Sequence, residues 1–141
     1  MIKVFIQISV KMTDEPGELV KFTNLLHNND ISIKSITVSQ IPGLVLFIVD
    51  KPGRAIDLLK EQDYEFSKKK VIAVPLPDNP TSSQEIEKVA EILGSNQVNI
   101  DFLYTSFIKN SPMLIIHVSD NETAKKALKD KGMYVLEKLE D

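Results

Sequence analysis

The chain has 141 residues, of which 43% are hydrophobic and 26% charged, and its formal net charge is −3. This composition is typical of a globular protein, and the length suits one ordinary domain or two small ones. Because the sequence contains no cysteine, it excludes disulfides, zinc–thiolate sites, iron–sulfur clusters and thiol chemistry.

The N-terminal segment MIKVFIQISV is interrupted by Lys3 and Gln7 and lacks the apolar run of a signal peptide. No apolar stretch approaches the roughly 20 residues of a membrane span. We therefore expect a cytoplasmic protein that does not bind membranes. Neither half of the chain has the basic excess that phosphate backbones require, so we also expect no binding to nucleic acid.

Apolar periodicity in the first half of the chain predicts four strands and two helices. In chain order these are a strand at 2–10, a helix at 19–26, strands at 31–40 and 44–49, a helix at 52–59 and a strand starting at Tyr64. The segment from Ile41 to Gly43 is predicted to be a turn, and Pro52 is predicted to open the second helix.

The same order of elements recurs in the second half. It consists of a strand at 70–76, a helix at 86–93, strands at 98–108 and 113–118, a helix at 124–128 and a closing strand at 133–136. The polar run from Ser67 to Lys70 is interpreted as a solvated linker between the repeats. We therefore expect two domains, at residues 1–68 and 69–141.

The order β-α-β-β-α-β is that of the ferredoxin-like split βαβ unit, an α+β fold with an antiparallel sheet and helices on one face. The segment Leu44–Val49 is apolar on both of its faces, and such a strand is normally covered on both. We therefore expect the second face to meet the other repeat or another subunit, and we expect the chain to form a homo-oligomer, a dimer.

The sequence shows no catalytic constellation. The two histidines, His27 and His117, lie in a predicted helix and a predicted strand, where a structural role is the simpler interpretation. The chain has no phosphate-binding glycine cluster, no Cys-x-x-Cys motif and no base-stacking aromatic signature. We expect no catalytic residue, no metal and no cofactor.

The junction between the first strand and the first helix is the most informative segment. Gly17 permits unusual backbone angles and close approach, and the first-turn amides of a helix attract a carboxylate. Asp14 could accept a hydrogen bond from an ammonium group. The amides and Asp14 together would suit the carboxylate and the ammonium group of a free amino acid. The alternative is that Asp-x-Pro-Gly is simply an ordinary way to start a helix.

The run Asp14–Leu19, followed by a helix and then by Asn29–Ile33, resembles the ACT-domain motif. The resemblance covers essentially the whole chain twice, as in small stand-alone tandem ACT proteins. It implies non-catalytic modules that bind amino acids at the interface between two ACT units and regulate amino-acid metabolism.

The resemblance also implies the ligand-binding positions. The polar residue of the family's loop falls on Asp14 and Asp78, and the family's asparagine falls on Ser32 and Asn99. The family's glycine is present as Gly17 but is replaced by Thr81 in the second repeat, where a short insertion follows Pro80. The candidate ligand-binding residues are Asp14, Glu15, Pro16, Gly17, Glu18, Leu19, Ser32, Asp78 and Asn99.

Three functions remain open from the sequence. The first is a non-catalytic regulatory protein that binds a small molecule, most simply an amino acid. The second is a regulatory subunit that docks on a separate enzyme without binding a ligand itself. The third is a small enzyme, which would need a convergent acid–base pair that the sequence does not show.

Overall fold

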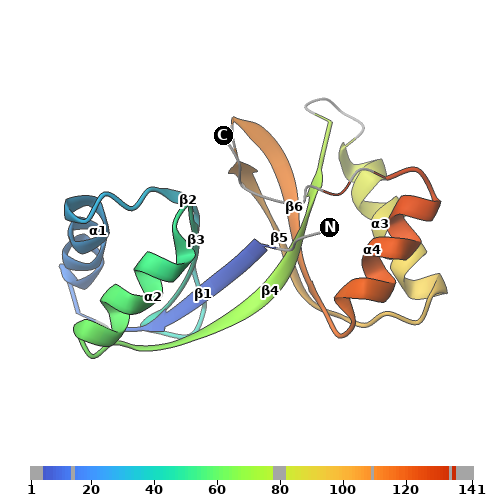
Figure 1. The fold of residues 1–141 in the computed structure, drawn as a ribbon. Helices are drawn as coiled ribbons and strands as arrows, with labels where there is room; N and C mark the ends of the chain where they lie inside the picture. Colours follow the sequence, from blue (N-terminus) through green and yellow to red (C-terminus); the bar gives the residue numbers. More distant parts are fainter. Residues whose placement is uncertain (1–4, 14, 78–81, 109, 134, 136–141) are drawn as a thin grey trace. The chain divides into compact units, whose positions relative to one another are not determined.

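The structure, a computed structural model, describes residues 5–13, 15–77, 82–108, 110–133 and 135. Within these residues the chain forms six strands and four helices, which confirms the predicted α+β class (Figure 1). In chain order they are β1 (Phe5–Lys11), α1 (Glu18–Asn28), β2 (Ile33–Val38), β3 (Leu44–Val49), α2 (Pro52–Glu61), β4 (Glu65–Pro75), α3 (Ser82–Ser95), β5 (Ile100–Ile108), β6 (Ser111–Val118) and α4 (Asn121–Asp130).

The chain divides into two compact units. The first unit is Ile6–Lys69, and the second comprises the residues from Lys70 onward together with Phe5. The strand order is β2-β3-β1-β4 in the first unit and β4-β6-β5 in the second. Strand β3 pairs antiparallel with β1 and β2, and β6 pairs antiparallel with β4 and β5. Both units are ferredoxin-like, as predicted.

The core of the first unit lies between one face of its sheet and the two helices α1 and α2. Phe22 of α1 contacts Phe47 of β3 edge-on, with ring centroids 5.1 Å apart. The buried residues of this core are Ile8, Val10, Phe22, Leu26, Ile31, Phe47, Val49, Ala55, Ile56, Leu58 and Leu59. Because α1 and α2 present apolar residues at a spacing of three and four, each buries one side against the sheet.

The second unit repeats this arrangement, with α3 and α4 packed against each other. Its core combines Val89 and Leu93 of α3 with Ala124 and Leu128 of α4 and with apolar residues of the sheet. The N-cap of α4 is Asp120, whose side chain accepts hydrogen bonds from the amide and the hydroxyl of Thr123. This cap fixes where α4 begins.

The run predicted to be a linker between the repeats is part of a strand, although it is solvated as expected. Strand β4 continues without interruption through Ser67–Lys70, and the three lysines at 68–70 are exposed. A strand is held by its backbone groups, so a run of lysines is compatible with it wherever the side chains reach water. In the predicted closing strand, Met133 and Val135 are buried but are not in a strand, and the rest of that segment lies outside the described residues.

The two faces of β3 are buried to different extents. Phe47 and Val49 belong to the core under the helices, whereas Ile48, on the opposite face, is 1% exposed and pairs with the buried Ser35 of β2. Leu44 and Leu46, which share the face of Ile48, are half-buried. The second face of this strand is therefore shielded at one end and partly open at the other.

Candidate functional site

The turn between β1 and α1 is the candidate site predicted from the sequence. Helix α1 begins at Glu18, and Gly17 is its N-cap in the left-handed region, with φ 92° and ψ −13°. Pro16 therefore precedes the cap and lies outside the helix. A residue with a side chain rarely adopts this φ, so the turn requires glycine at position 17. Asp14 lies outside the described residues.

The first turn of α1 leaves backbone donors facing outward. The amide of Lys21 donates to the carbonyl of Gly17 at 3.0 Å, and the amide of Glu18 donates to that of Glu15 at 3.2 Å. Within the part of the chain that the structure describes, the amides of Leu19 and Val20 have no partner. Such amides carry the positive end of the helix dipole and favour a negative ligand group.

The carboxylate of Glu18 places negative charge beside this turn. Burial, and secondarily the charge of Glu18, raise the pKa of the Tyr64 hydroxyl above its ordinary value. Tyr64 also contacts the edge of the Phe22 ring, with centroids 5.7 Å apart. Glu18 is half-buried and Glu15 is exposed, so the turn combines outward amides with two acidic side chains.

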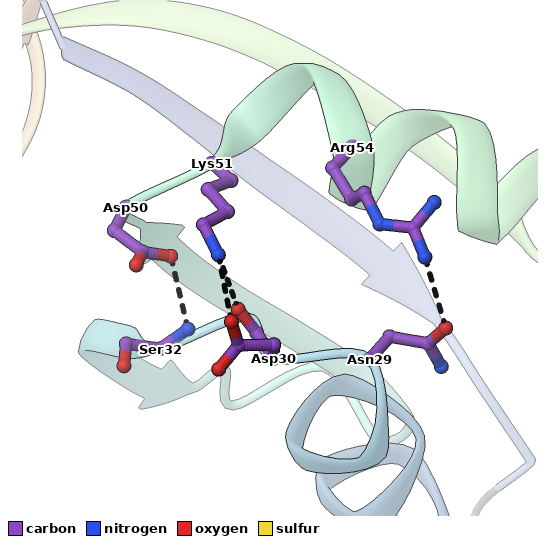
Figure 2. A network of polar contacts seen from close by, with 6 residues as sticks. All are labelled: Asn29, Asp30, Ser32, Asp50, Lys51 and Arg54. Atoms are coloured by element: carbon purple, nitrogen blue, oxygen red, sulfur yellow. Dashed lines mark hydrogen bonds and ion pairs between the residues drawn. The ribbon is translucent and has the colours of Figure 1, made fainter.

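The structure does not bring Ser32 to this turn. Ser32 lies beyond the C-terminal end of α1, and an 11-residue helix is about 16 Å long. Its amide donates to Oδ1 of Asp50 at 2.9 Å (Figure 2). Its carbonyl accepts from the amide of Asp50 at 3.1 Å. Both backbone groups of Ser32 therefore join the start of β2 to the end of β3.

Polar contacts at this end of the first unit form a network that the sequence did not predict. Lys51 donates to the carbonyl of Asp30 at 2.8 Å and to its carboxylate at 3.2 Å, and Arg54 donates to Oδ1 of Asn29 at 3.2 Å (Figure 2). The partners are 21 and 25 residues apart in sequence. No local motif could have indicated them, because the fold alone brings the two connections together.

In the second repeat the corresponding loop lies outside the described residues, which leaves Asp78 without a structural test. Asn99 is described and exposed. Its carbonyl accepts from the amide of Ser119 at 3.2 Å, just as the carbonyl of Ser32 accepts from Asp50. Ser32 and Asn99 therefore occupy equivalent places in the two units, each away from the strand–helix turn. The side chain of Asn99 donates to Oδ1 of Asp101 at 3.1 Å.

The histidines have separate environments. His27 is exposed in the last turn of α1. His117 of β6 stacks on Phe102 of β5, with centroids 5.0 Å apart and an interplanar angle of 11°. Its Nδ1 lies 2.9 Å from Oδ2 of Asp101, within ion-pair range but without hydrogen-bond alignment. The contact joins neighbouring strands, which fits the structural role expected for this residue.

The described residues contain no group of three or more His, Asp or Glu side chains that could hold a metal ion. Among the same residues, no helix has the length and apolar character needed to cross a bilayer.

Comparison with solved structures finds chains of the same fold. Protein BT0572 from Bacteroides thetaiotaomicron is 23% identical, with a TM-score of 0.84 over 96% of this chain and 93% of that one. The regulatory subunit of aspartate kinase from Thermus flavus is 18% identical, with a TM-score of 0.63 over 92% and 94% of the two chains. E. coli aspartokinase III, solved with lysine and aspartate, is 16% identical, with a TM-score of 0.57 over 91% of this chain but 31% of its own.

Comparison with curated proteins finds no match. Comparison with family models finds the ACT domain pair over residues 3–140. That match spans nearly the whole chain, and it agrees with the two ferredoxin-like units. The chain therefore belongs to the ACT domain pair family.

Proposed function

We propose that this protein is a non-catalytic regulator that binds a free amino acid at the β1–α1 turn of its first unit. The observation that carries the proposal is the geometry of this turn in a chain that is an ACT domain pair. Gly17 caps α1 in the left-handed region, and the amides of Leu19 and Val20 that follow it have no partner among the described residues. An ACT pair is a regulatory module, and two structures of the same fold are regulatory subunits of aspartate kinase, from Thermus flavus and Thermus thermophilus.

The proposed ligand pose follows from the charges at the turn. The α-carboxylate would accept hydrogen bonds from the amides of Leu19 and Val20, where the dipole of α1 favours negative charge. The α-ammonium would be held by Asp14, which comes shortly before these amides in the sequence. Ser32 is excluded from the pose because it lies at the other end of α1.

The acidic side chains at the turn restrict the ligand class. Glu15 and Glu18 would repel a ligand with a second negative charge, so a neutral or basic amino acid is favoured over aspartate or glutamate.

A second candidate function is a regulatory subunit that docks on a separate enzyme without its own ligand. The Thermus flavus neighbour supports this alternative, because it is a regulatory subunit of about the same length as this chain. The two candidates differ in one respect that is easily measured, the stabilisation of the isolated protein by a free amino acid.

The first experiment is thermal melting of the purified protein with each of the common amino acids. A ligand at 100 times its dissociation constant adds about 2.7 kcal/mol to the free energy of unfolding, which gives a clear rise in Tm. We expect a neutral or basic amino acid to produce this rise. If every amino acid leaves Tm unchanged at millimolar concentration, the ligand-binding function is wrong and the docking subunit is favoured.

The second experiment locates the site by calorimetry with the amino acid found in the first. Asp14→Ala and Gly17→Val should each weaken binding about tenfold, which is about 1.4 kcal/mol. Asp78→Ala, the matched position in the second repeat, should have a smaller effect. Loss of binding only with Asp78→Ala would move the site to the second unit, and equal affinity in all three variants would remove it from both turns.

A further inference from the structure

Several large apolar side chains of the first unit are exposed. Leu19 and Val20, in the first turn of α1, are 40% and 61% exposed, and Val38, the last residue of β2, is 60% exposed. Ile41, between β2 and β3, is 62% exposed. Single exposed apolar residues are ordinary in proteins, whereas a group of them at one place indicates a binding surface. These four side chains form such a surface only if the fold brings them together.

The backbone of the sheet brings the end of β2 close to the end of β1. Val10 of β1 and Val38 of β2 pair with the same residue of β3, Val45, from its two sides. The amide of Met12, which follows β1, donates to the carbonyl of Gly43 in the β2–β3 connection at 2.7 Å. The end of β2 and this connection therefore lie at the end of the sheet from which the chain turns into α1.

The side chains of Leu19 and Val38 lie on the same side of the sheet. Val38 stands opposite Val45, which shares a face of β3 with Phe47 because side chains alternate along a strand. Phe47 contacts Phe22 of α1. Leu19 precedes Phe22 by three residues and therefore lies on the same side of that helix. The apolar surface that results, beside the start of α1, is formed by Leu19, Val20, Val38 and Ile41.

We propose that the amino acid bound at the β1–α1 turn is aliphatic, such as leucine, isoleucine or valine, and that its side chain lies on the apolar surface. The inference rests on the proposed function, in which the amides of Leu19 and Val20 bind the α-carboxylate. The same two residues contribute their side chains to the apolar surface, so a ligand held by those amides has its own side chain beside it. Contact between the two removes apolar area from water, which stabilises the complex.

The size and the chemistry of the apolar surface favour this occupant. Four side chains are far fewer than the about 20–30 residues that each partner of a standard protein interface contributes. None of the four carries a charge, so a basic ligand would bring its ammonium group to apolar neighbours and lose hydration without gaining a partner from them. The inference thus narrows the neutral or basic class to aliphatic amino acids.

Calorimetry of the natural chain with leucine, alanine and lysine tests the ligand class. Each methylene group that is buried strengthens binding about fourfold. We expect leucine to bind about tenfold more tightly than alanine, or better, and more tightly than lysine. If alanine or lysine binds as tightly as leucine, the inference is overturned while the proposed function stands. If no amino acid binds, both are wrong.

Substitutions on the apolar surface test where the side chain of the ligand lies. Val38→Ser and Ile41→Ser should each weaken leucine binding about fourfold to tenfold and change alanine binding by less than about twofold. Leu103→Ser, at a side chain of the second unit that is 42% exposed, is the matched control and should leave both affinities unchanged. Circular dichroism should show that all three variants fold.

Three results with these variants would overturn the inference. The first is equal weakening of leucine and alanine binding, and the second is unchanged leucine binding in both Val38→Ser and Ile41→Ser. Either result would place the side chain of the ligand elsewhere. The third is dissociation of an oligomer by these two variants, seen by sedimentation, with the preference for leucine over alanine retained. In that case a protein, and not the ligand, covers the apolar surface.

Discussion

The ammonium nitrogen of Lys125 lies 2.8 Å from a carboxylate oxygen of Glu122, although the Lys125 side chain is 2% exposed and that of Glu122 is 82% exposed. The pair thus joins a buried cation to a partner that is largely in water. Removing an ammonium group from water is unfavourable, and a solvent-exposed carboxylate compensates for it only in part because water screens the attraction. Lys125 is therefore a position where the fold retains a destabilising group.

Replacing Lys125 with an apolar residue of similar length should stabilise the protein. We expect Lys125→Met to raise the free energy of unfolding by about 1 kcal/mol, measured by urea denaturation, because the buried charge is removed and the volume is kept. Lys126→Met is the control, since Lys126 is exposed and pairs with Asp130 at 3.3 Å; its effect should be close to zero. A Lys125→Met variant that is less stable than Lys126→Met would contradict this account.

The cap of α4 should give the protein an acid-sensitive contribution to stability. Hydrogen bonds from the side chain and the amide of Thr123 lower the pKa of Asp120 below its ordinary value. A carboxylate whose pKa is lower in the folded state stabilises the fold above its unfolded pKa, and the contribution is lost as pH falls through the folded pKa. We expect Asp120→Ala to lower Tm at neutral pH and to lower it less in strong acid. Asp120→Asn keeps a capping oxygen and should retain more of the neutral-pH Tm. If the alanine variant melts like the natural chain at neutral pH, the cap does not stabilise α4.

Tyr64 should make the first unit less stable in alkali. Its pKa is raised by burial and by the charge of Glu18, so the folded state holds the hydroxyl proton more tightly than the unfolded chain does. This contribution is complete below the unfolded pKa of about 10 and is lost as pH rises through the folded value. Tyr64→Phe should therefore flatten the fall of Tm above pH 10. Glu18→Gln should lower the pKa of Tyr64, as ultraviolet titration would detect; an unchanged titration would place Glu18 outside the range of electrostatic influence.

Two glycines with empty surroundings should respond to alanine in opposite ways. No heavy atom lies within 4 Å of a Cβ built on Gly17 or on Gly94, so neither substitution causes a clash. Gly17 has φ 92°, and alanine there should cost about 1 kcal/mol of backbone strain. Gly94 lies in α3 without a positive φ, so Gly94→Ala should stabilise by about 0.5 kcal/mol or more. Chemical denaturation of both variants checks this difference, and a Gly17→Ala variant as stable as the natural chain would show that the turn relaxes out of the left-handed region.

The agreement between the predicted and the observed positions differs among the residues of the candidate site. The glycine turn was predictable, because an Asp-x-Pro-Gly run before an apolar helical pattern is a local signal. That Gly17 is the cap and that Pro16 lies before it depend on the backbone angle that the turn adopts. Ser32 was grouped with this turn by resemblance to a motif, and a motif in sequence carries no information about which end of a helix a residue occupies.

The sequence by itself determined the order of the four helices and of most strands, the repeat and the α+β class, because these follow from apolar periodicities of two and 3.6 residues and from local turn residues. Only the tertiary structure decided that β4 runs unbroken through three lysines, that Lys51 pairs with Asp30, and that Lys125 is buried. Each of these features depends on contacts between segments far apart in the chain or on which side chains reach water. Such relationships leave no local pattern in the sequence, because the energies that select them exist only once the sheets and helices have packed.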